Sequence, residues 1–125
     1  MSNPFTELRV AVTESLIHAD IPAYASPQAT TPVPSVTVSP GNPYAQPLTL
    51  NSYETTLLLT VSVQAFDSAA SLQVLEDLAF RCLKALPPGV SVSEVDAPNL
   101  VSLGDAQGKV YQTVITITAQ VKESN

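Results

Sequence analysis

The sequence predicts an α+β fold, a two-layer sandwich in which two helices lie on one face of a mostly antiparallel, four-stranded sheet. Residues 55–66 carry no charge and alternate as a strand does, and an amphipathic helix follows directly. A second long alternating segment, 109–122, lies near the end of the chain. All 125 residues are expected to form a single domain.

The central unit of this fold is a strand followed by a helix. Alternate residues over 57–65 are apolar, so one face of the strand should point into a core. Asp67 or Ser68 supplies a side-chain oxygen that can cap the helix. Apolar residues then recur at helical spacing over 72–86, and Pro-Pro-Gly at 87–89 ends the helix. The expected core residues are Leu57, Leu59, Val61, Leu75, Cys82, Ile115 and Ile117.

The first segment also has helical spacing. Asn3 can cap a helix whose first residue is Pro4, and an apolar stripe runs to about residue 19. Val10 and Ile17 lie nearly opposite that stripe. A helix that is apolar on both sides is either enclosed in a core or shared with a neighbouring subunit, and of the two we favour contact with a neighbour.

A change of composition marks residues 21–52 as a long proline-rich arm. Seven of the eleven prolines of the chain lie in this span, and proline lacks the N–H that a helix or a central strand requires. We expect one short edge strand, 35–39, and otherwise a loop that becomes ordered on a partner. Tyr24 and Tyr44 are its candidate anchors.

The C-terminal part is expected to form an antiparallel pair. A third strand covers 90–95, breaks at 96–99 and resumes at 100–103. Gly108 supplies the turn at 105–108, and the final strand over 109–122 returns beside it.

The charge balance limits the possible partners. The net charge is −6 with only five Lys and Arg residues, which are scattered and cannot neutralise a run of phosphates, so we expect no direct binding of nucleic acid. Charged residues make up 13% of the chain against about 25% in a typical domain. Either other subunits cover much of the surface, or this is a soluble domain rich in Ser and Thr.

The sequence contains no combination of residues typical of an enzyme, and we expect no cofactor and no metal. His18 is the only histidine, and Cys82, the only cysteine, falls on the buried stripe. Glu94, Asp96 and Asp105 could at most offer oxygen ligands beside a turn. The chain begins without the features of a signal peptide and has no apolar run of about 20 residues, so we expect an intracellular origin and no membrane span.

One aromatic residue does not match its position. Phe80 falls on the charged side of the second helix, among Glu76, Asp77 and Lys84. An isolated exposed aromatic residue is common, but aromatic residues also lead among those that anchor protein partners.

The overall layout resembles the tail terminator proteins of long-tailed bacteriophages. The resemblance covers nearly the whole chain, through LRVAVTESLI at 8–17, VSVQAFD at 61–67, LKALPPG at 83–89 and YQTVITITAQV at 111–121. It is carried by the order of these segments and by no signature motif.

This resemblance implies a structural virion protein in the neck region, assembled in the host cytoplasm. Subunits of that family form a homohexameric ring that caps the head-proximal end of the tail tube. The ring stops tail polymerisation and gives the head–tail connector or stopper protein a docking surface. No catalytic or cofactor residue is implied. The candidate interface residues are Val10, Ile17, Tyr24, Tyr44 and Phe80.

Two alternatives stay open. One is another phage neck protein, either a tail completion or a stopper protein, and the other is a small ligand-binding or regulatory α+β domain. The assembly state separates the last from a terminator, because a terminator must close a ring.

Overall fold

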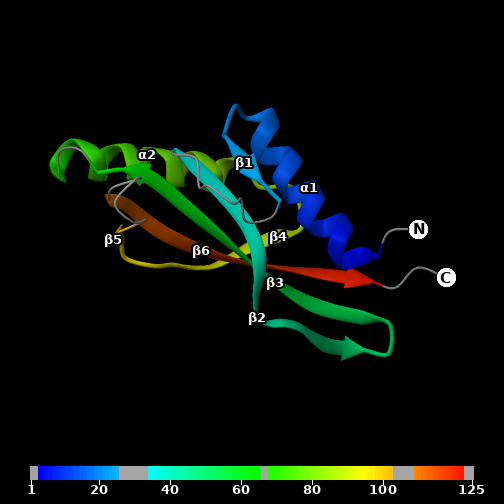
Figure 1. Ribbon diagram of the computed structural model, residues 1–125. Coiled ribbons are helices and arrows are strands. Elements are labelled where there is room, and N and C mark those ends of the chain that lie inside the picture. The colour runs from blue at the N-terminus through cyan, green and yellow to red at the C-terminus, as the bar shows by residue number, and fades with distance from the viewer. Residues whose placement is uncertain (1–2, 26–33, 66–67, 103–108, 123–125) are drawn as a thin grey trace.

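The computed structural model describes residues 3–25, 34–65, 68–102 and 109–122, and these form two helices and a six-stranded sheet (Figure 1). The helices are α1 (Pro4–His18) and α2 (Ser68–Ala85). The strands are β1 (Ala23–Tyr24), β2 (Ser35–Thr49), β3 (Ser52–Gln64), β4 (Val90–Val95), β5 (Asn99–Ser102) and β6 (Lys109–Lys122). The α+β class is as the sequence predicts, whereas the expected count of four strands is wrong.

The long strands β3 and β6 pair antiparallel along their whole length and form the centre of the sheet. The strand order is β1-β2-β3-β6-β4, and only β1 and β2 run parallel. Because β3 occupies one side of β6, both β4 and β5 must lie along its other side. They form one edge strand that is interrupted between Val95 and Asn99, which confirms the break predicted in this segment. The expected turn at 105–108 lies outside the described residues.

The segment 21–52 is not the proline-rich arm that the sequence predicts. Fifteen of its described residues form β2, a strand paired with β3, so the expected short strand over 35–39 is wrong in length. Residues 26–33 of the expected arm lie outside the described residues.

The prolines of β2 are compatible with a strand for a topological reason. Among the described residues, only β1, two residues long, lies on the outer side of β2, so along most of the strand a missing N–H removes no ladder bond to another described strand on that side. On its inner side the pairing with β3 shifts register between Pro40 and Ala45 and again between Pro47 and Thr49. These irregularities let the chain accommodate proline.

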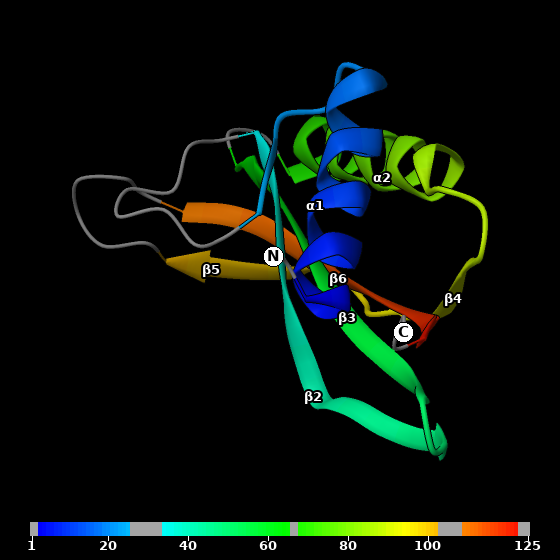
Figure 2. The same cartoon turned by 90° about the vertical axis from the view of Figure 1, so that its right-hand side faces the viewer.

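Both helices lie on the same face of the sheet and enclose the core (Figure 2). Alternate residues of β3 and β6 point into it, and α1 contributes Val12 and Leu16. All seven residues expected in the core are buried, which confirms the period-two and helical patterns: Leu57, Leu59, Val61, Leu75, Cys82, Ile115 and Ile117.

Local interactions define the ends of the helices. The side chain of Asn3 accepts a hydrogen bond of 2.8 Å from the Thr6 N–H, which confirms the expected cap of α1. At the other end of α1, the Arg81 guanidinium of α2 donates to the carbonyls of Ala19 and Asp20, at 3.3 and 3.1 Å. This arginine therefore ties the two helices together. Neither helix of the described chain is both long and apolar enough to cross a bilayer.

Candidate assembly surfaces

The hairpin end is the exposed end of the β2–β3 ribbon, residues 45–55, and Figures 1 and 2 show it at the opposite end of the molecule from α2. Its turn is formed by Leu50 and Asn51, and Leu50 is 99% exposed. Asparagine suits a turn, but leucine supplies neither a special backbone conformation nor a local hydrogen bond. Leu48 beside it is exposed as well. Burial within this chain therefore does not account for either leucine.

The tip of the hairpin end and the strand that leads to it are uncharged, and the one charged residue of the hairpin end is Glu54 in β3. Residues 40–52 contain no Asp, Glu, Lys, Arg or His. Burying this segment against another surface would thus desolvate no ionised group, which is the most costly part of forming an interface.

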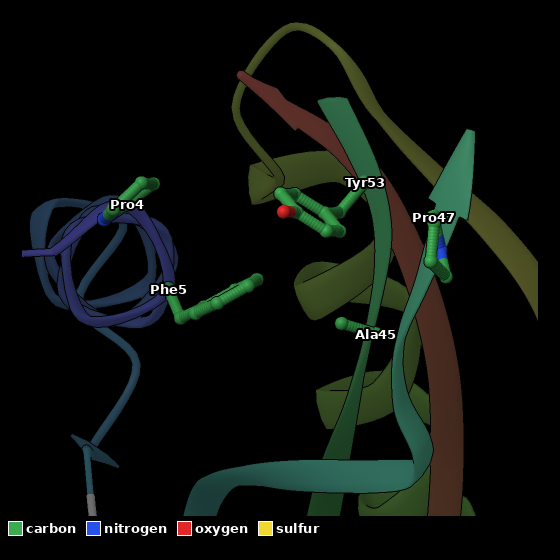
Figure 3. Close-up of a pocket in the computed structure, with 5 residues that line it drawn as sticks. All are labelled: Pro4, Phe5, Ala45, Pro47 and Tyr53. Atoms are coloured by element: carbon green, nitrogen blue, oxygen red, sulfur yellow. The ribbon is translucent and has the colours of Figure 1, made fainter. Parts of the chain in front are cut away.

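A pocket of about 410 Å³ lies at the base of the hairpin end, between α1 and the two strands (Figure 3). Its lining residues are Pro4, Phe5, Ala45, Pro47 and Tyr53. The Phe5 ring lies 6.0 Å from that of Tyr53, edge to face, and 5.4 Å from that of Tyr44. The Tyr53 hydroxyl is the only polar side-chain group of the lining, so the pocket suits apolar matter and offers little to orient a polar ligand.

A second hollow, the α2–edge groove, lies between α2 and the interrupted edge strand and has a volume of about 280 Å³. It is lined by Leu75, Glu76, Ala79, Phe80, Leu83, Val95, Asp96, Pro98 and Thr113. The Asp96 N–H donates to the Val114 carbonyl at 2.9 Å, and the Thr113 hydroxyl donates to the Asp96 carbonyl. These two bonds hold the break between β4 and β5 in a defined shape.

The edge strand itself exposes apolar side chains. Val92, Val95 and Leu100 pair with Ile117, Ile115 and Tyr111 of β6 and so share the helix-covered face of the sheet. All three are nevertheless exposed. Since β4 is the last strand, the backbone groups on its outer edge have no strand partner within the described residues.

Phe80 lies where the sequence placed it, on the outer side of α2, and is 57% exposed. The Lys84 ammonium lies 4.8 Å from the centre of its ring, a cation–π contact that fixes one face of the aromatic side chain. Phe80 also lines the α2–edge groove, so its exposed ring belongs to a larger apolar surface.

The five candidate interface residues lie on four different elements. Val10 and Ile17 are exposed on α1, at 38% and 52%, and Phe80 is exposed on α2. Tyr24 in β1 and Tyr44 in β2 are half-buried. Tyr44 is not a free anchor on an arm, because its ring contacts Phe5 and it packs against the core.

Sequence reasoning missed the leucines of the hairpin end and the apolar residues of the edge strand. The available signal was Leu-Thr-Leu-Asn at 48–51, apolar residues directly before a turn residue. The surrounding prolines led us to expect an arm, in which such a pattern has no structural meaning.

The described residues contain little that could perform chemistry. Burial of Cys82 raises the pKa of its thiol to about 11, and the nearby Arg81 charge opposes this only in part, so the group stays protonated at neutral pH. No three His, Cys, Asp or Glu side chains of the described residues come together in a way that could hold a metal ion.

In comparisons with known proteins, neither a protein-family model nor a curated protein matches the chain. The fold itself leaves two apolar surfaces exposed, the hairpin end and the α2–edge groove with its neighbouring strand edge.

Proposed function

We propose that this chain is the subunit of a closed ring that caps the head-proximal end of a phage tail tube. The ring ends tail polymerisation and presents a surface on which the head connector or stopper protein docks. We propose six subunits in this ring, a number implied by the resemblance of the sequence to tail terminators.

The observation that supports this proposal most directly is the presence of two unlike contact surfaces at opposite ends of the subunit. The hairpin end carries the exposed Leu48 and Leu50, and the α2–edge groove is lined by α2 residues that include Phe80. Figures 1 and 2 show the hairpin end and α2 at opposite ends of the subunit. A ring built head to tail uses two different patches on every subunit, whereas a twofold dimer uses one patch twice. The pair of surfaces suits a ring.

The character of the remaining surface also supports an assembled protein. The face of the sheet opposite the helices carries mostly Ser, Thr and Gln from β3 and β6, many of them half-buried. Together with a charged fraction of 13%, this leaves a monomer with few of the charges that usually keep a domain soluble and apart from its copies.

The mass of the purified protein is the first test. Native mass spectrometry over a wide range of protein concentrations should show one closed oligomer, and negative-stain electron microscopy should show rings. The phage that encodes the chain supplies the second test: without a working copy it should make tails of uncontrolled length that fail to join heads. A strictly monomeric protein, or normal joined tails in that mutant, would contradict the proposal.

One observation favours the alternative of a small ligand-binding domain, namely the pocket of about 410 Å³ between Phe5 and Tyr53. A hydrophobic dye that binds a monomer with one-to-one stoichiometry, and that loses binding in Tyr53→Ala, would support this second function. A ring whose assembly is insensitive to such a dye would favour the terminator.

A further inference from the structure

We propose, resting on the ring function above, that the contact between neighbouring subunits places the hairpin end of one copy in the α2–edge groove of the next. Leu50 then enters the apolar groove beside Phe80. The occupant is thus a second copy of this chain, contributed through a segment that its own fold does not bury.

The first argument is the state of Leu50. A side chain that is 99% exposed, in the turn of the β2–β3 hairpin, has almost no intramolecular contact to lose on insertion. Its burial therefore gains the full favourable free energy of transferring a leucine side chain out of water. The groove provides a matching environment, since Leu75, Ala79 and Leu83 contribute apolar walls.

The second argument is geometric. Figures 1 and 2 show the hairpin end and α2 at opposite ends of the subunit, and α2 residues line the groove, so the tip cannot reach the groove of its own chain. Contact is therefore possible only between copies. Because the two surfaces differ, each copy offers one tip and one groove, and repetition of the contact gives a ring when the rotation between neighbours closes after a whole number of copies.

The third argument is electrostatic. Two copies that each carry −6 repel one another, and an approach through a segment without charge, 40–52, limits the repulsion at the contact. The charged residues that line the groove are both acidic, Glu76 and Asp96. The tip carries an amide donor next to Leu50, because Asn51 is the other turn residue. An amide N–H that donates to a carboxylate forms a charge-assisted hydrogen bond. A basic residue at the tip would form a stronger interaction with the carboxylate, and an acidic residue would repel it.

The open edge of β4 offers no equally good site for the outer edge of β2 of another copy. Pro40, Pro43 and Pro47 remove N–H donors from that strand, and proline is a common device against edge-to-edge pairing. Insertion of the tip does not need those donors. The proposal therefore favours contact through side chains over a continuous intersubunit sheet.

Crosslinking between copies tests this contact. In the double variant Asn51→Cys and Val95→Cys, one thiol lies beside Leu50 and the other lines the groove, and both Leu50 and Phe80 are retained. A short bis-maleimide reagent should give a ladder of covalent oligomers that ends at the mass of the ring. The native Cys82 is buried with a raised pKa, so the unmodified protein should give no ladder with the same reagent.

In the control the second thiol is on α2, at a position outside the groove, instead of at Val95 of β4. Val74 is 52% exposed and does not line the groove, so Asn51→Cys with Val74→Cys should crosslink far less. An equal ladder in this control, or dimers from Asn51→Cys alone, would contradict the contact. A ring that forms without any crosslink to position 95 would overturn this inference and leave the proposed function standing. A protein that stays monomeric would overturn both.

A charge substitution gives an independent readout. Leu50→Asp would bury an unpaired carboxylate, so the concentration at which half of the protein is assembled should rise by at least about tenfold. Val74→Asp, on a surface outside the contact, should leave that concentration unchanged. Equal effects of both variants would show that added charge, and not the site, weakens assembly.

Discussion

The two ends of the β2–β3 ribbon are both paired antiparallel, with register shifts only toward the hairpin end, and they have opposite surroundings. At one end Val36 pairs with Val61 and Val38 with Leu59, and all four side chains are fully buried beneath the helices. At the other end the same two strands pair as far as the turn at 50–51, yet the leucines there are exposed. Pairing builds the ribbon at both ends, but only the helices bury it.

This difference separates two uses of an apolar residue. Beneath α1 and α2 a leucine stabilises the fold by leaving water when the chain folds. At the hairpin end a leucine can leave water only when the protein meets another surface. Substitutions at the two ends should therefore change different quantities, the free energy of unfolding and the strength of assembly. The predictions below follow from this contrast.

The largest effect on stability is expected beneath α2. Leu75→Ala should lower the free energy of unfolding by about 2–5 kcal/mol, because a fully buried leucine leaves a cavity in the core. Chemical denaturation monitored by circular dichroism measures this. The neighbouring Val74→Ala, on the exposed side of the same helix, should change stability by no more than about 0.5 kcal/mol. Similar losses for both would mean that α2 is not packed as described.

The next effect concerns the junction between the two ends. A Cβ at Gly41 would lie 2.6 Å from the Thr56 Cγ2 atom and 3.0 Å from the Thr56 carbonyl oxygen. Gly41→Ala should therefore cost about 1–3 kcal/mol through overpacking. Adding Thr56→Ser removes that methyl group and should restore part of the loss, which a double-mutant cycle in denaturant would measure. If Gly41→Ala has the same free energy of unfolding as the parent, β2 at Gly41 does not lie this close to Thr56 of β3.

A smaller effect is expected where α1 begins, beside the base of the hairpin end. Asn3→Ala removes the acceptor for the Thr6 N–H and should cost about 0.5–2 kcal/mol. Asn3→Asp retains an acceptor and should stay close to the parent in thermal unfolding. Should Asn3→Asp lose as much as Asn3→Ala, the stabilisation comes from something other than the cap.

The smallest effect on stability is expected at the tip of the hairpin end. Leu50→Asp should leave the unfolding free energy of the unassembled subunit within about 0.5 kcal/mol of the parent, since a fully exposed side chain loses no burial. Denaturation at a concentration below assembly measures this. A marked loss would show that Leu50 already contributes to the fold of the single chain, and the contrast between the two ends would fail.

The fold could be predicted from the sequence where local periodicity carries the information. The strand ending at Gln64, the helix ending before Pro87 and the final strand were all expected, because their alternation or helical spacing is visible in the residues themselves. The cap at Asn3 is equally local. Phe80 could be placed on the outer side of its helix by the same spacing.

Strand β2 and the two assembly surfaces could not be predicted in this way. Whether a proline interrupts a strand depends on which side of that strand has a neighbour, and β2 has only the short β1 outside it. The exposure of Val95 and Leu100 likewise depends on how far α2 reaches across the edge of the sheet.

The sequence by itself determined the α+β class, the central strand–helix unit and the residues of the core, because each follows from periodicity within one segment. Only the tertiary structure decided that residues 35–49 of the proline-rich segment form a strand, that Tyr44 packs against Phe5, and that α2 and the hairpin end lie at opposite ends of the subunit. Those facts depend on which segments become neighbours. Strand order and the reach of the helices set these neighbours, and no local pattern of residues encodes them.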